Sequence, residues 1–158
     1  MKISRLTDWI SQIPSVPEVN FFVFAFLVNF VYEVWQSPYF EFYNQPSLAE
    51  KIAAINHCTF GDGVITVICS LIVSWLYRSR YWILQASWKS ILIFTGLGWA
   101  YTFVSEIYRT RIAHLYGVFN FTLPIIGISW LPLLQWAILP PIVIYLTRRQ
   151  ILGELNRR

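Results

Sequence analysis

Charged residues are scarce in this sequence. Asp, Glu, Lys and Arg make up 13% of its 158 residues, whereas soluble domains average about 25%. Hydrophobic residues instead make up 56% of the chain and aromatic residues 18%. This composition is not that of a soluble globular protein. It indicates a single integral membrane domain that spans residues 1–158.

The sequence also has few cysteines and no apparent signal peptide. Cys58 and Cys69 lie in what reads as one helix, where a rise of about 1.5 Å per residue separates them by roughly 16 Å, too far for a disulfide. The first 14 residues lack a continuous apolar core, so they do not resemble a cleavable leader. Their apolar residues fall on one helical face, which predicts an N-terminal helix lying in the membrane interface.

Four apolar segments are long enough to cross a membrane, which takes about 20 residues per helix. We place the crossings at about residues 19–39, 59–77, 88–107 and 131–149. Ser47 and Glu50 form a capping box, so the second helix should begin near Ser47, ahead of its apolar part. The sequence therefore predicts an all-α bundle of four transmembrane helices.

The last third of the chain contains several glycines and prolines that should break or bend helices. Gly117, Pro124 and Gly127 interrupt the apolar stretch before the fourth helix, which predicts a loop or a re-entrant segment covered by protein. Ser129 could cap the fourth helix, and Pro140 with Pro141 should kink it. Paired small residues in the second and third helices, Gly61 with Gly63 and Gly96 with Gly98, should allow close helix packing.

The distribution of Lys and Arg predicts the orientation of the chain. With the N-terminus in the cytoplasm and four crossings, nine of the twelve basic residues fall in inner segments, as the positive-inside rule requires. Both termini are therefore expected in the cytoplasm, and a bacterial inner membrane is the expected location. Trp75, Trp82 and Trp88 should belong to the inner aromatic belt. Because the basic residues flank the membrane, the net charge of +4 does not indicate a nucleic-acid partner.

Polar residues gather at one end of the predicted bundle. Asn29, Glu33 and Gln36 share one helical face because they are four and three residues apart. The first and third helices run outward, and the second and fourth run inward. Late residues of the first pair and early residues of the second pair therefore meet in the outer half. The residues concerned are Glu33, Gln36, His57, Asp62, Glu106, Arg109, His114 and Gln135.

Each of these residues also has a structural interpretation. Glu106 and Arg109 could simply neutralise each other, and polar amides such as Gln36 often join helices in bundles. A histidine near the membrane interface, such as His57, needs no special role. Glu33 and Asp62 are harder to explain in this way, because a charged group within a crossing costs about 2.5–3.5 kcal/mol.

Three carboxyl groups and a histidine in an apolar setting suggest acid–base chemistry, in which one group donates a proton and another accepts one. We predict a small intramembrane enzyme of the isomerase or cyclase type that acts on a lipid-soluble molecule such as an isoprenoid. Its candidate catalytic residues are Glu33, Asp62, His57 and Glu106. Its candidate supporting or ligand-binding residues are Asn29, Gln36, Arg109, His114 and Gln135. The sequence does not identify a cofactor. Glu33, His57, Asp62, Glu106 and His114 could also supply a carboxylate-rich metal site, although no Glu-x-x-His or His-x-x-x-His spacing is present.

The same residues allow a second interpretation without catalysis. The chain could be a non-catalytic subunit, or a pigment- or lipid-binding module, of a larger membrane complex, and it could also form a homo-oligomer. His57 or His114 could then ligate a haem or chlorophyll, and the polar residues would form a buried network between helices. A transporter is a third interpretation, although four helices without an internal repeat would have to oligomerise to form a pathway.

Several strings in the chain form a pattern of their own: "YEVWQSPYF", "NHCTFGDGVI", "GWAYTFVSE" and "WLPLLQWAILPP". This pattern resembles one found in small bacterial multi-pass membrane proteins without a known activity. The resemblance covers most of the chain. It draws attention to the same polar residues that the topology brings together: Glu33, Gln36, His57, Asp62, Glu106 and Gln135.

Overall fold

A computed structural model of the chain describes residues 15–40, 47–114, 117 and 121–157. The expected interfacial helix lies outside the described residues. The described chain folds into four long helices and contains no β-strand. All four helices are long and apolar enough to cross a membrane, which confirms the predicted all-α membrane bundle.

The helix boundaries follow local signals in the sequence. Helix α2 (Pro17–Gln36) starts at a proline and continues into a short 3-10 turn, η2 (Ser37–Tyr39). Helix α3 (Leu48–Leu76) begins at the predicted capping box, in which the Ser47 side chain accepts from the Glu50 backbone amide. Helix α4 (Trp88–Ile107) is extended by a π-helical turn, η5 (Tyr108–Ile112), and α5 covers Leu131–Leu155.

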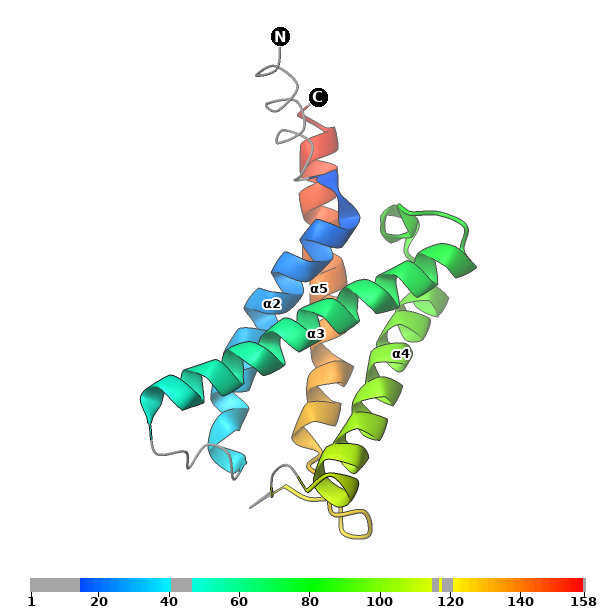
Figure 1. The fold of residues 1–158 in the computed structure, drawn as a ribbon. Coiled ribbons are helices and arrows are strands. Elements are labelled where there is room, and N and C mark those ends of the chain that lie inside the picture. The colour runs from blue at the N-terminus through cyan, green and yellow to red at the C-terminus, as the bar shows by residue number, and fades with distance from the viewer. Residues whose placement is uncertain (1–14, 41–46, 115–116, 118–120, 158) are drawn as a thin grey trace.

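Helix α5 is the centre of the bundle. It packs against both α2 and α4, while α3 crosses obliquely over α2 and also contacts α4 (Figure 1). Half of the residues in the apolar stretch of α5 are buried, compared with about a third or less in the apolar stretches of the other three helices. The helix continues through Pro140 and Pro141. Helix α2 begins and α5 ends at the same end of the bundle (Figure 1).

An apolar core fills the end of the bundle where α2 begins. The Phe21 ring lies 5.8 Å from Trp82 and 5.3 Å from Phe94, measured between ring centroids. The 3-10 turn η4 (Trp82–Gln85) folds the α3–α4 connection back onto the helices. Trp82 is therefore 3% exposed, and its indole nitrogen donates to Ser70 Oγ. Its predicted place in an interfacial aromatic belt was wrong, because this turn buries the ring.

Two of the four paired glycines allow close helix packing. A Cβ atom on Gly98 would overlap the Trp136 ring, and one on Gly63 would lie 2.9 Å from the Phe22 ring. The backbone of α4 thus approaches α5, and that of α3 approaches α2, as predicted. A Cβ atom on Gly61 or Gly96 would have no atom within 4 Å, so these two glycines are not sites of close packing.

The connection into α5 is a closed turn at the opposite end of the bundle. Thr122 and Ser129 form an antiparallel bridge, and Gly127 adopts a φ of +66°, which favours glycine. The Ser129 side chain accepts a hydrogen bond from the Leu131 backbone amide, but the N-cap residue of α5 is Trp130 and not the predicted Ser129. Arg111 Nε donates to the Ile126 carbonyl and ties η5 to this turn.

Candidate functional site

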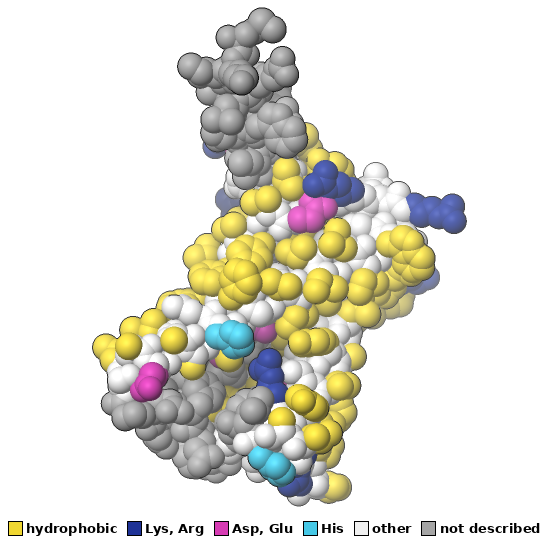
Figure 2. Space-filling view, in the orientation of Figure 1, with side chains coloured by type: hydrophobic (Ala, Val, Ile, Leu, Met, Phe, Trp, Pro, Cys, Tyr) yellow, Lys and Arg dark blue, Asp and Glu magenta, His cyan; other side chains and the backbone are white. Residues whose placement is uncertain are grey.

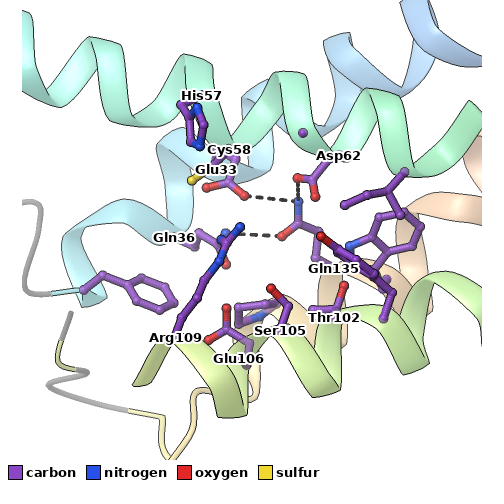
Figure 3. A pocket seen from close by; sticks show the side chains of 16 residues that line it. Glu33, Gln36, His57, Cys58, Asp62, Thr102, Ser105, Glu106, Arg109 and Gln135 are labelled. Carbon is purple, nitrogen blue, oxygen red and sulfur yellow. Dashed lines mark hydrogen bonds between the residues drawn. The ribbon is translucent and has the colours of Figure 1, made fainter. Parts of the chain in front are cut away.

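A cavity of about 100 Å³ lies among all four helices, in the half of the bundle opposite the Phe21 core. Figure 2 shows that the face below α3 is hollowed there, with acidic side chains visible in the hollow and a basic side chain beside it. Seven of the nine predicted site residues line the cavity (Figure 3). They are Glu33, Gln36, His57, Asp62, Glu106, Arg109 and Gln135.

The Gln135 side chain connects α5 to α2 and α3. Its amide nitrogen lies 2.7 Å from Asn29 Oδ1, 2.9 Å from Asp62 Oδ2 and 3.3 Å from Glu33 Oε1. An amide nitrogen carries two hydrogens, so these three acceptors compete for two donors. Gln135 itself is 2% exposed, and its position one helical turn into α5 brings its amide between the two carboxyl groups (Figure 3).

The three amides of this network have fixed orientations. Asn29 Nδ2 donates to the Ala25 carbonyl at 2.8 Å, so Asn29 Oδ1 faces Gln135. Because the Gln135 nitrogen faces acceptors, its oxygen points the other way and accepts from Gln36 Nε2 at 3.2 Å. Gln36 must therefore turn its oxygen elsewhere. Within the described part of the chain, no donor reaches Gln36 Oε1, although Gln36 is only 3% exposed.

Helix α4 supplies the opposite wall of the cavity. Glu106 is 5% exposed, and its backbone carbonyl accepts a hydrogen bond from the Thr110 hydroxyl. Arg109 follows in η5 and extends across the cavity toward α2 (Figure 3). Its guanidinium group interacts electrostatically with both Glu33 and Asp62, which also interact with each other. The cavity therefore contains three carboxyl groups and one guanidinium group.

The remaining predicted residues lie at or beyond the edge of the cavity. His57 lines it but is largely exposed. Asn29 does not line this cavity. It bonds to Gln135 and lines a second cavity of about 10 Å³. His114 is exposed, adopts a φ of +49° and does not line the cavity, because the chain turns away after η5. The predicted convergence on the site thus does not extend to His114.

Sequence reasoning did not assign Cys58, Ser105 or Trp136 to the site, yet all three line the cavity. Cys58 is four residues before Asp62 and thus on the same helical face, a signal that could have identified it. Ser105 and Trp136 directly neighbour predicted residues in sequence. Neighbouring residues point about 100° apart on a helix, so their inclusion depends on how the helices pack.

The described residues do not form a recognisable metal-binding group. Among residues 15–40, 47–114, 117 and 121–157, no three His, Cys, Asp or Glu side chains are placed to hold a metal ion. The chemistry of the site as described therefore comes from its carboxyl, amide, guanidinium, imidazole and thiol groups.

Comparisons with known proteins assign no family to the chain. No protein-family model matches it, and neither a curated protein nor a solved structure matches it.

Proposed function

We propose that this chain is a small intramembrane enzyme of the isomerase or cyclase type, which moves protons to and from a lipid-soluble molecule such as an isoprenoid. One observation carries the proposal. The Gln135 amide nitrogen offers two hydrogens to three acceptors, of which two belong to the Glu33 and Asp62 carboxyl groups. A proton shared by these carboxyl groups supplies the missing hydrogen.

Such a pair has the two states that acid–base catalysis requires. The protonated carboxyl group donates to one carbon of a substrate double bond, which leaves a positive charge on the other carbon. The ionised carboxyl group removes a proton from the next carbon along, and the double bond moves by one position. Glu106 and Arg109 adjust the charge around the pair, and His57 at the rim can exchange protons with water. After one turnover the proton has moved from one carboxyl group to the other, and exchange with water restores the starting state.

The size of the cavity limits what it can take. Pockets that enclose a whole drug-sized ligand measure about 300–1,000 Å³, whereas this cavity measures about 100 Å³. Only the reacting end of a lipid molecule fits inside, and its tail must lie among the helices or in the surrounding lipid. This arrangement suits a substrate that diffuses within the membrane.

We propose a bacterial inner membrane as the location, with both ends of the chain in the cytoplasm. The α3–α4 connection, the start of α4 and the end of α5 carry six of the nine basic residues that the structure describes. These residues are Arg78, Arg80, Lys89, Arg148, Arg149 and Arg157. The cavity then faces the outer leaflet.

Deuterium transfer tests the function even when the substrate has not been identified. The purified protein is placed in lipid nanodiscs with a total lipid extract of the source membrane, in heavy water. Addition of a deuteron at one end of the double bond and removal of a proton from the carbon beyond its other end leave one deuterium in the product. One lipid species should therefore gain one mass unit. We expect Glu33→Gln and Asp62→Asn to reduce this labelling at least about 100-fold.

Glu154→Gln is the matched control, because it makes the same change at the far end of α5, where Glu154 pairs with exposed Arg157. It should label as the wild type does. If the wild-type protein labels no lipid, the proposal of an enzyme is wrong, and a non-catalytic subunit or lipid-binding module becomes the better explanation. If both cavity variants label normally, Glu33 and Asp62 are not the proton-transfer pair.

A further inference from the structure

The acceptor oxygen of Gln36 has no donor among the described residues, although the side chain is buried and lines the cavity. The neighbouring amides fix the direction of this oxygen. Turning the Gln36 amide over would bring its oxygen against the Gln135 oxygen, which in turn cannot turn over without facing three acceptors. The network therefore presents a buried acceptor to the cavity.

A buried acceptor without a donor costs free energy, because it has lost its hydrogen bonds to water. A ligand that donates a hydrogen bond to Gln36 Oε1 recovers this energy, whereas a ligand that only accepts does not. The unpartnered oxygen thus indicates a bound group with N–H or O–H bonds.

The charges of the cavity distinguish between these two kinds of donor. Glu33, Asp62 and Glu106 contribute three carboxyl groups, and Arg109 contributes one positive charge. With one proton shared by Glu33 and Asp62, one negative charge remains in excess. A hydroxyl group leaves that excess in place, but a protonated amine cancels it and donates up to three hydrogen bonds.

We propose that the cavity binds the protonated primary amine of an amphiphile, with the –NH₃⁺ group donating to Gln36 Oε1 and to the Glu33–Asp62 pair. This inference goes beyond the proposed function and rests on it for the shared proton. A bound ammonium group occupies the place of the reacting end of the substrate, so the amine competes with the substrate. An ammonium group with its first few carbons suits a cavity of about 100 Å³. The tail of the molecule leaves the cavity on the hollowed face (Figure 2).

Three probes with the same six-carbon tail separate charge from hydrogen bonding. Hexylamine at pH 7 carries both a charge and N–H donors, hexyltrimethylammonium carries the charge alone, and 1-hexanol carries a donor alone. Each is titrated against the purified protein in a nonionic detergent, and the thermal unfolding midpoint is recorded. We expect hexylamine to raise the midpoint saturably by about 5 °C or more, and native mass spectrometry to show one bound amine per chain.

The other two probes should produce no saturable rise. Equal shifts with all three probes, or no shift with hexylamine, would overturn the proposal. Equal shifts with hexylamine and hexyltrimethylammonium would also overturn it, because the donated hydrogen bonds would then be unnecessary. Ethylamine, which hardly partitions into micelles, identifies the source of the amine. Binding at a similar aqueous concentration indicates a water-soluble amine, and binding of hexylamine alone indicates a lipid-borne one.

Two variants connect binding to the cavity. Gln36→Met removes the acceptor oxygen and should weaken hexylamine binding at least about tenfold. Because this change also removes a donor to Gln135 and can impair folding, Gly61→Val is the second variant. Gly61 lines the cavity, and a Cβ atom there meets no atom within 4 Å, so the added side chain narrows the site without disturbing the network.

Gly96→Val is the matched control, because Gly96 has equally open surroundings but does not line the cavity. It should bind hexylamine as the wild type does. Unchanged binding in Gly61→Val and in folded Gln36→Met would place the amine elsewhere and refute the proposal. These measurements detect binding and not turnover, so amine binding without deuterium transfer would refute the enzyme alone.

Discussion

Gly98 of α4 lies directly against the indole ring of Trp136 of α5, with no room for a Cβ atom between them. This contact sets the spacing of two helices that line the cavity. Trp136 directly follows Gln135, whose amide nitrogen lies within hydrogen-bonding distance of both carboxyl groups. The contact with Gly98 therefore lies next to the hydrogen-bond network of the cavity.

Gly98→Ala should therefore destabilise the protein, because the new methyl group must displace the Trp136 ring or separate α4 from α5. Overpacking of this kind typically costs about 1–3 kcal/mol. Thermal unfolding in detergent measures the effect, with Gly96→Ala as the control, since a Cβ atom there meets no atom within 4 Å. Equal stability of the two variants would show that α4 and α5 do not pack so closely.

Gln135→Leu should be among the most damaging single changes in the bundle. It leaves Asn29 Oδ1, Gln36 Nε2 and the two carboxyl groups without their shared partner, at about 1–3 kcal/mol for each buried group. The loss should appear as a much lower resistance to unfolding in a denaturing detergent. Gln150→Leu, near the far end of the same helix, removes only a weak 3.4 Å bond to Glu154 and should have little effect.

A comparison of Trp82 with Trp75 tests whether Trp82 belongs to the apolar core. Trp82 is 3% exposed and packs against Phe21 and Phe94, whereas Trp75 is 77% exposed. Trp82→Ala should cost about 3–5 kcal/mol of unfolding free energy, and Trp75→Ala about 0.5 kcal/mol or less. Similar losses in the two variants would mean that Trp82 anchors the membrane interface and is not a core residue.

Fusion reporters test the proposed orientation. A green fluorescent protein fused to the C-terminus should fluoresce, and alkaline phosphatase fused after Ala113 should be active, because the enzyme folds only outside the cytoplasm. Alkaline phosphatase fused after Arg78 should be inactive. The opposite pattern would reverse the membrane sidedness of the cavity and contradict the positive-inside argument.

Much of the fold could be predicted because the signals are local. Ser47 and Glu50 specify the start of α3 by direct hydrogen bonding to backbone amides. Helical periodicity and the alternating direction of the crossings were sufficient to bring Glu33, Asp62, Glu106 and Gln135 to one cavity. The start of α3 and the depth of these four residues in the bundle follow without knowledge of how the helices rotate about their axes, whereas their facing one cavity also depends on that rotation.

The remaining features depend on tertiary packing. The burial of Trp82 depends on a short turn that folds back onto the helices, and the position of His114 depends on the chain direction after η5. Likewise, the sequence shows that Asn29, Gln36 and Gln135 are amides, but not which end of each amide faces which neighbour. The orientations of these amides determine that the Gln36 oxygen faces the cavity, and only the three-dimensional contacts reveal those orientations.

The apolar core around Phe21, Trp82 and Phe94 has an electrical consequence. In a membrane, water and ions can approach the carboxyl groups through the cavity, but a cluster of buried apolar and aromatic side chains closes the other half of the bundle. A transmembrane voltage then falls mainly across that insulating half. Protons that reach Glu33 and Asp62 cross little of the field, which is otherwise worth about 2.3 kcal/mol per charge for each 100 mV. The proton exchange that the proposed function requires would therefore depend little on the transmembrane voltage.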